Sequence, residues 1–294
     1  MSDGIYMKGI IIKGIGGFYY VKTANNSVYE CKARGIFRKD KITPTVGDRV
    51  EITIKDNKGS IDTIYERKSL LIRPPVANID TIIIVVAAAE PEPNTKIIDK
   101  MILNAKVAGI EPIICINKTD IKDGDTLEAV YHNAGYRVIK VSAKESKGID
   151  ELNSVLKDRI SAFAGISGVG KSSLLNELTD VGAQTGEISD KIQRGKHTTR
   201  HVELFELPYG GYVLDTPGFS TFEPTDIKAD ELWHYFPEME AVGDNCRFRG
   251  CLHINEPDCA VKEKLDMGNI AHSRYESYVE IYNILKEKKD WEKK

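Results

Sequence analysis

The feature that most constrains the fold is a complete Walker A pattern, Gly165-Ile166-Ser167-Gly168-Val169-Gly170-Lys171-Ser172. Such a loop needs a strand before it and a helix after it, and the flanking residues show both patterns. Its backbone N–H groups surround a phosphate, while Lys171 reaches the β- and γ-phosphate oxygens and the Ser172 hydroxyl binds Mg²⁺. The alternative, a glycine-rich turn, is disfavoured by the full match and by both flanks. We expect nucleotide contacts from every residue of the loop and from Ser173.

An α/β pattern surrounds this loop from about residue 80 to residue 222. Continuous apolar runs, typical of parallel strands covered on both faces, alternate with helical patterns. Strands are expected at 81–88, 112–116, 137–141, 162–166 and 211–214, and helices at 95–107, 126–133, 149–159 and 172–178. The alternation predicts a doubly wound α/β domain.

Two further motifs at strand ends indicate which base is bound. Asn117-Lys118-Thr119-Asp120 resembles the Asn-Lys-x-Asp motif of GTP-binding proteins. The Asp120 carboxylate can accept hydrogen bonds from the ring N–H and the exocyclic amine of guanine, whereas adenine would leave it unsatisfied. The Lys118 stem would cover the base. Ser142-Ala143-Lys144 resembles the companion motif, in which the Ala143 N–H meets the guanine oxygen. Together with the Walker A loop, these motifs predict a guanine-nucleotide site.

Two switch segments would contact the γ-phosphate and Mg²⁺. Asp215-Thr216-Pro217-Gly218 resembles the Asp-x-x-Gly switch, which contacts Mg²⁺ through water and also meets the γ-phosphate. The other switch must lie in the polar stretch 184–200. We assign the second Mg²⁺ ligand there to Thr199, with Thr198 as the alternative.

These motifs occur in a permuted order. Ordinary GTPases run from the phosphate loop through the switches to the two base-reading motifs, but here the base-reading motifs come first and Gly165, Thr199 and Asp215 follow. Each motif lies at the end of its own strand, so connecting the strands elsewhere leaves the site intact. The order therefore predicts a circularly permuted GTPase domain.

The first seventy residues predict short strands separated by glycines and charged turns, without a helical pattern. These strands are expected at 10–12, 18–21, 28–31, 50–54 and 61–65. Five such strands favour a small OB-fold barrel, which commonly presents a basic face to oligonucleotides. The pair Pro74-Pro75 then marks the expected domain boundary.

Charge is divided unevenly along the chain. Residues 1–75 carry fourteen Lys or Arg against eight Asp or Glu, so they sum to +6 and the remaining residues to −9, within a total of −3. A basic barrel joined to an acidic body indicates contact with nucleic acid or another polyanion, unless these are scattered solvated side chains. The basic cluster beside Phe37 consists of Lys32, Arg34, Arg38, Lys39 and Lys41.

Three cysteines and a histidine gather near the C-terminus: Cys246, Cys251, His253 and Cys259. Three thiolates and an imidazole within fourteen residues match a tetrahedral Cys₃His zinc site, and four protein ligands leave no open position for catalysis. The alternative is three buried free cysteines near a histidine. Cys31 and Cys115 lie in apolar strands and are expected in the core. The chain ends in an expected helix, 273–288.

Length and composition fit this division. A chain of 294 residues suggests two or three domains, which we expect at 1–70, 71–222 and 223–294. The longest uncharged apolar run, 82–89, is too short to span a bilayer, and the N-terminus lacks the pattern of a secretory signal. We therefore expect a cytoplasmic protein without membrane contact, whose cysteines are reduced unless a metal binds them.

Nearly the whole chain resembles the RsgA/YjeQ family, circularly permuted GTPases that depend on the small ribosomal subunit. The resemblance rests on the basic barrel, on the permuted motifs Asn117–Asp120 and Gly165–Ser172, and on the Cys₃His cluster. It implies a GTP hydrolase in late maturation of the small (30S) subunit, which binds 16S ribosomal RNA through its flanking domains. It also implies one structural zinc ion, hydrolysis that is slow alone and faster on the subunit, and release after hydrolysis. We expect the protein to be a monomer.

The expected catalytic groups depart from those of common GTPases. Phe219 follows the Asp-x-x-Gly motif, where many GTPases carry a glutamine that orients water, and Gly168 stands where potassium-activated enzymes have asparagine. Lys171 and Mg²⁺ would offset charge on the transferred phosphoryl group. His197 is the nearest polar candidate to orient water, unless it is a surface histidine. Two other functions stay open: a nucleotide-gated RNA-binding module with incidental hydrolysis, and a permuted GTPase that acts on the large subunit or in another process.

Overall fold

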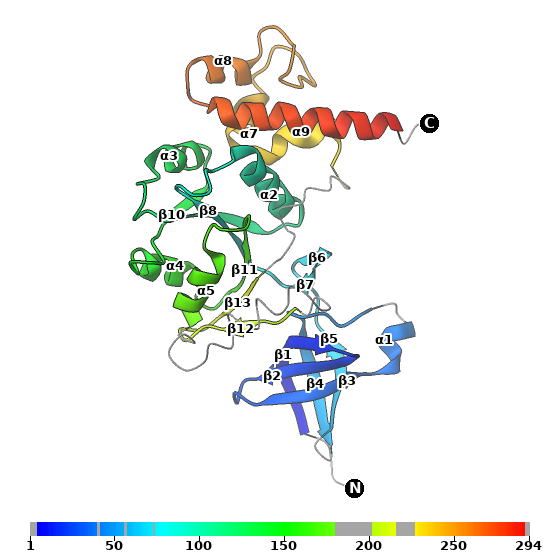
Figure 1. Ribbon diagram of the computed structural model, residues 1–294. Coiled ribbons are helices and arrows are strands. Elements are labelled where there is room, and N and C mark those ends of the chain that lie inside the picture. Colours follow the sequence, from blue (N-terminus) through cyan, green and yellow to red (C-terminus); the bar gives the residue numbers. More distant parts are fainter. Residues whose placement is uncertain are drawn as a thin grey trace. The chain divides into compact units, whose positions relative to one another are not determined.

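The computed structural model describes residues 5–39, 42–55, 58–72, 74–179, 202–215 and 227–291 (Figure 1). It confirms the expected fold class, namely a five-stranded barrel, an α/β sheet and a C-terminal part with helices and a Cys₃His cluster. In the described part of the chain, no helix is long and apolar enough to cross a membrane. The bounds of the three domains stay predictions.

The expected barrel consists of β1 (Ile5–Ile15), β2 (Phe18–Thr23), β3 (Val28–Ala33), β4 (Arg49–Lys55) and β5 (Lys58–Ile64). The strands follow the order β1-β2-β3-β5-β4, and β4 pairs with β1 to close the barrel. Its core is formed by buried residues on alternate positions, chiefly Ile11, Val21, Val50, Ile52 and Ile61. Two features differ from the prediction: β1 extends beyond the expected 10–12 at both ends, and a five-residue helix, α1 (Gly35–Lys39), separates β3 from β4.

A buried carboxylate ties one end of the barrel to the segment that follows it. Asp48 is fully buried and accepts two hydrogen bonds from Arg67, at 2.7 and 2.8 Å, and one from the Thr45 N–H, at 2.7 Å. The hairpin of β6 (Leu70–Ile72) and β7 (Pro75–Ala77) adds a link, since the Ala77 N–H donates to the Val46 carbonyl. The proline pair expected at a boundary thus lies in a hairpin held against the barrel.

The α/β part contains a six-stranded sheet in the order β10-β9-β8-β11-β13-β12. Its strands are β8 (Thr81–Ala87), β9 (Glu111–Asn117), β10 (Arg137–Lys140), β11 (Ile160–Ala164), β12 (Phe205–Glu206) and β13 (Tyr212–Asp215). β9 and β10 are parallel, as are β11 and β13, whereas β12 pairs with β13 in the antiparallel direction. All residues of β8 and β11 are buried, as expected for strands covered on both faces.

Helices α2 (Thr95–Val107), α3 (Asp125–Asn133), α4 (Ile149–Leu156) and α5 (Lys171–Thr179) follow strands of this sheet. α2 has the predicted bounds, whereas most other elements begin or end one to three residues from the predicted positions. Two of these ends have a clear local reason. α4 ends at Leu156, since Asp158 has a left-handed φ of 59°. β11 ends at Ala164, because Gly165, with a φ of 150°, turns the chain into the loop.

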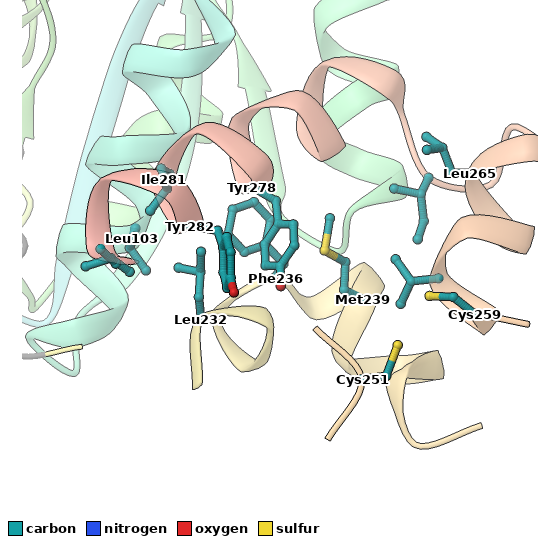
Figure 2. Close-up of a cluster of buried hydrophobic side chains, with 13 residues drawn as sticks. Leu103, Leu232, Phe236, Met239, Cys251, Cys259, Leu265, Tyr278, Ile281 and Tyr282 are labelled. Atoms are coloured by element: carbon teal, nitrogen blue, oxygen red, sulfur yellow. The ribbon is translucent and has the colours of Figure 1, made fainter. Parts of the chain in front are cut away.

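The C-terminal part is built around helix α9 (His272–Trp291), together with a 3₁₀ helix η2 (Ala229–Tyr235), α7 (Pro237–Gly243) and α8 (Ala260–Asp266). Figure 2 shows its apolar cluster, in which Phe236 and Tyr278 pack edge to face with ring centroids 5.5 Å apart. Leu103 of α2 belongs to the same cluster, so α2 and α9 share one core.

A buried guanidinium strengthens this shared core. Arg274 of α9 is 1% exposed, and its Nη1 donates to Asp99 of α2 at 2.6 Å. Its Nε and Nη2 donate to both carboxylate oxygens of Glu238 in α7, at 2.7 and 3.2 Å. The Tyr131 hydroxyl of α3 also donates to Asp99, at 3.0 Å. Arg274 therefore connects α9 to α2 and α7, and Tyr131 links α3 to the same group of side chains through Asp99.

We expect Arg274→Met to lower the free energy of unfolding by about 3–5 kcal/mol, because removal of one partner leaves buried carboxylates uncompensated. The matched control is Lys228→Met, which breaks the exposed Lys228–Glu231 pair and should leave the free energy of unfolding nearly unchanged, because exposed ion pairs contribute little to stability. Urea unfolding followed by circular dichroism measures both. Equal, small effects of the two substitutions would contradict this prediction.

Candidate functional site

The phosphate loop connects β11 to α5, as the sequence predicts. Lys171 donates from Nζ to the carbonyl oxygens of Gly165 and Ile166, at 2.8 and 3.1 Å, so its ammonium group lies against the loop backbone. Val169 is buried, whereas Ser167 and Gly168 form an exposed tip. Because α5 begins at Lys171, its N–H groups and the positive end of its dipole lie beside the loop, which favours an anion there.

Two glycines of the loop are required by close backbone approach. A Cβ at Gly170, whose φ is 93°, would lie 2.3 Å from Nδ2 of Asn117. A Cβ at Gly165 would lie 2.4 Å from the carbonyl oxygen of Val85. Any larger residue at either position would push the loop away from the strands that support it.

The side chain of Asn117 connects the three predicted motifs. Asn117 ends β9 and is 2% exposed. Its Nδ2 donates to the Val169 carbonyl of the phosphate loop at 2.9 Å, and its Oδ1 accepts from the Ala143 N–H at 3.1 Å. The phosphate loop and the base-reading loops are therefore held in one arrangement by a single amide.

Asp120 lies beside the second base-reading motif. Its Oδ1 accepts a hydrogen bond from the Ser142 hydroxyl at 2.7 Å, and Nζ of Lys144 lies 3.9 Å from its Oδ2. The Ser142 bond holds the pKa of Asp120 below its ordinary value, although burial acts in the opposite direction. The carboxylate is therefore ionised at neutral pH and has the acceptor character that guanine recognition requires.

The segment after β8 also borders this site, although the sequence analysis did not single it out. Lys118 has a left-handed φ of 66°, and its Nζ donates to the carbonyl oxygen of Glu90. Pro91 approaches the loop from the same segment, since its Cδ would lie 3.7 Å from a Cβ at Gly168. Thr119 holds the Asn117–Asp120 motif in place, because its hydroxyl and its N–H donate to the Val141 carbonyl at 3.0 and 3.2 Å. In the sequence, the Glu90-Pro91 pair directly after an apolar run was the signal that could have identified this segment.

The switch residues are only partly described. Asp215 ends β13 and pairs in register with Phe163 of β11, two residues before the phosphate loop begins. His197, Thr198, Thr199, Gly218 and Phe219 lie outside the described residues. Their predicted roles, and those of Ser172 and Ser173 on the first turn of α5, stay predictions.

The predicted metal ligands are brought together by the fold. Cys246, Cys251, His253 and Cys259 place one ligand atom each within 4.8 Å of all the others. Cys246 and Cys259 have sulfurs 3.8 Å apart, and Nδ1 of His253 lies 3.5 and 3.4 Å from them. Tetrahedral zinc with bonds of about 2.3 Å to sulfur and about 2.0 Å to nitrogen separates such atoms by about 3.8 and 3.5 Å. The cluster can therefore bind a metal ion.

Protonation of this cluster is linked to metal binding. Burial raises the pKa of Cys251 to about 12 and also raises that of Cys259. Because the thiolate is the metal ligand, an incoming ion must displace protons from these thiols. Cys31 and Cys115 lie apart in strands β3 and β9 and are buried, which confirms their predicted place in the core.

Comparisons with known proteins agree with this architecture. A family model described as RsgA GTPase matches residues 64–225, and one described as RsgA N-terminal domain matches residues 8–61. The chain is 50% identical over 287 residues to the small ribosomal subunit biogenesis GTPase RsgA of Caldanaerobacter subterraneus subsp. tengcongensis, covering 96% of this chain and 97% of that protein. Identity to the protein of that name from Bacillus subtilis is 44% over 294 residues, covering 96% and 98%.

Two solved structures are similar over nearly their full lengths. The crystal structure of YjeQ from Thermotoga maritima gives a TM-score of 0.81 at 39% identity and covers 96% of this chain and 99% of that chain. YloQ, described as a circularly permuted GTPase, gives a TM-score of 0.81 at 39% identity and covers 97% and 96%.

Asp120→Asn should weaken GTP binding roughly 10²- to 10⁴-fold, since two bonds to a charged acceptor, worth about 1.5–3 kcal/mol each, are lost. Xanthosine triphosphate should then bind better than GTP, because a carbonyl replaces the exocyclic amine and suits an amide donor. Equilibrium titration with both nucleotides measures the exchange. Asp150→Asn, at an exposed carboxylate on α4, controls for the lost charge; unchanged GTP affinity in Asp120→Asn would refute the assignment.

Proposed function

Because the chain belongs to the RsgA family of small ribosomal subunit biogenesis GTPases, we propose that it hydrolyses GTP to GDP and phosphate during late maturation of the small (30S) subunit. The observation that carries this proposal is the Asn117 amide, which holds the phosphate loop and the Ser142–Lys144 loop together at 2.9 and 3.1 Å. That contact brings a triphosphate site and a guanine site within reach of one nucleotide. We further propose that the protein acts as a cytoplasmic monomer.

The proposed nucleotide contacts follow the motifs. The base would be read by Asn117, Lys118, Thr119, Asp120, Ser142, Ala143 and Lys144. The phosphates would be held by Gly165, Ile166, Ser167, Gly168, Val169, Gly170, Lys171, Ser172 and Ser173. The switches would contribute Thr199, Asp215 and Gly218, and Mg²⁺ would be bound by Ser172 and Thr199.

The proposed reaction is in-line attack of water on the γ-phosphate. Mg²⁺ bound with GTP would neutralise phosphate charge, while Lys171 stabilises charge on the β- and γ-phosphate oxygens. His197 is proposed to orient the water, because Phe219 offers no hydrogen-bonding group.

We propose that the Cys₃His cluster holds one zinc ion with a structural role. The four side chains occupy all tetrahedral positions, so none remains for water or substrate. The metal would connect the segments that carry its four ligands, residues 246–259. On this basis residues 223–294 form a zinc-binding domain, after an RNA-binding domain at 1–70 and a GTPase domain at 71–222.

The barrel is proposed to bind 16S ribosomal RNA through the basic cluster beside Phe37. Lys32 is exposed, and its ammonium lies 4.7 Å from the Phe18 ring centroid. Arg34 is less available, because it pairs with Asp62 at 2.8 Å. The side chains of Arg38, Lys39 and Lys41 lie outside the described residues. Lys32 over an aromatic ring therefore offers the clearest described contact for a phosphate beside a stacked base.

Phosphate release should be slow for the protein alone and faster with small subunits, and Lys171→Ala should abolish both rates. Lys122→Ala, at an exposed lysine beyond the base-reading motif, is the matched control and should release phosphate normally. Large subunits should give no stimulation. Binding to small subunits without any stimulation, and without any loss in Lys171→Ala, would instead favour a nucleotide-gated RNA-binding module.

Lys32→Gln should lower the slope of log affinity against log salt, for small-subunit binding, by about one, since one phosphate contact is lost. Lys157→Gln removes a charge that is also exposed, from the segment after α4, and should leave the slope unchanged. Co-sedimentation over a range of salt concentrations, with GDP and with a non-hydrolysable GTP analogue, gives both slopes. Identical slopes for all three proteins would show that Lys32 is only a solvated side chain.

A further inference from the structure

The loop between Cys251 and Cys259 is shaped by one carboxylate. Oε1 of Glu256 accepts a hydrogen bond from the Leu252 N–H at 3.1 Å. Its Oε2 accepts from the N–H groups of Ile254 and Asn255, at 3.0 and 3.1 Å. The Glu256 carboxylate thus binds three N–H groups of residues 252–255, on both sides of His253 in the sequence.

Without such support this loop conformation is unfavourable. His253 has a φ of 60°, in the left-handed region that costs a residue with a Cβ of the order of 1 kcal/mol. Helix α9 holds two carbonyls of the same loop, since the Tyr275 hydroxyl donates to the His253 carbonyl at 2.7 Å and the Tyr278 hydroxyl donates to the Leu252 carbonyl at 2.6 Å. Side chains therefore fix both the N–H groups and the carbonyls of this loop.

The imidazole itself has no such support on its far nitrogen. Nδ1 of His253 faces Cys246 and Cys259, whereas its Nε2 is buried and has no hydrogen-bond partner among the described residues. Metal-binding histidines usually donate the second ring N–H to a carboxylate or carbonyl, which sets the ring orientation. Here Trp233 contacts the ring edge to face at 5.3 Å instead. The orientation of the ring must therefore come mainly from the backbone that carries it.

We propose that Glu256 is a positioning residue for the metal site. It fixes the backbone of His253 so that Nδ1 faces the three sulfurs before the ion arrives, and so replaces the usual hydrogen bond on the second ring nitrogen. This inference rests on the proposed zinc ion and adds to it a determinant of affinity that is not itself a ligand.

The test compares zinc affinity in Glu256→Gln with that of the parent protein, by competition with a chromophoric chelator. Glutamine retains one acceptor oxygen but turns an NH₂ group toward backbone donors, so the zinc dissociation constant should rise about 10- to 100-fold. Asp258→Asn removes a nearby exposed carboxylate that pairs with Arg247, and it should change the constant less than about twofold. Cobalt in place of zinc should give the same tetrahedral thiolate absorption bands in Glu256→Gln, reached at higher metal concentration.

A second variant keeps the test decisive if Glu256→Gln does not fold. Tyr275→Phe removes only the bond to the His253 carbonyl and should also raise the dissociation constant, while guanine-nucleotide binding reports that the protein is folded. Dissociation constants within twofold of the parent in the folded variants would overturn the inference and leave the zinc proposal standing. Absence of zinc from the parent protein would overturn both.

Discussion

The buried amide of Asn117 is the interaction that holds the loops of the predicted nucleotide site together. A permuted chain must bring together loops that are far apart in sequence, and in this protein the phosphate loop follows residue 164 while the base-reading loops precede residue 145. Asn117 donates to one of these loops and accepts from the other, and the space beside it admits only glycine at position 170. Because an amide has both a donor and an acceptor, neither aspartate nor leucine could make the two bonds.

A second constraint operates between α2 and α9. Arg274 and Asp99 are removed from water, which is unfavourable unless hydrogen bonds compensate for the lost hydration. Glu238 binds the other side of the guanidinium, and Arg274 and Tyr131 both donate to Oδ1 of Asp99, whereas its Oδ2 has no partner among the described residues. Lys96 and Lys100 of α2 also form ion pairs with Glu280 of α9, both at 2.7 Å, at the outer side of the contact between these helices. The Arg274 guanidinium lies 4.6 Å from the centroid of the Phe236 ring, and Phe236 belongs to the apolar cluster of Figure 2, which contains residues of both α2 and α9.

The sequence predicted the elements that repeat a pattern and missed those that depend on single contacts. Barrel strands, buried parallel strands and helix α2 follow hydrophobic periodicity, and the motifs identified the loops at the strand ends. The roles of Arg274, Asp48 and Glu256 were not predicted, because a charged residue in a sequence gives no sign of whether its partner is solvent or a residue many positions away. Helix α1 was missed because five residues are too few to show a period of 3.6.

The Asp99–Arg274 contact also bears on which part of the chain can fold alone. The GTPase family model and the motifs end before residue 227. Helix α2 of this region nevertheless contains the buried carboxylate of Asp99, and its cation, Arg274, lies in α9, the last helix of the chain. Cut at that border, the module would retain the anion and lose the counter-charge, along with the apolar partners of Leu103. Helix α2 therefore depends on the last helix of the chain for its counter-charge, so a truncation that removes α9 would leave a buried carboxylate unpaired inside the α/β part.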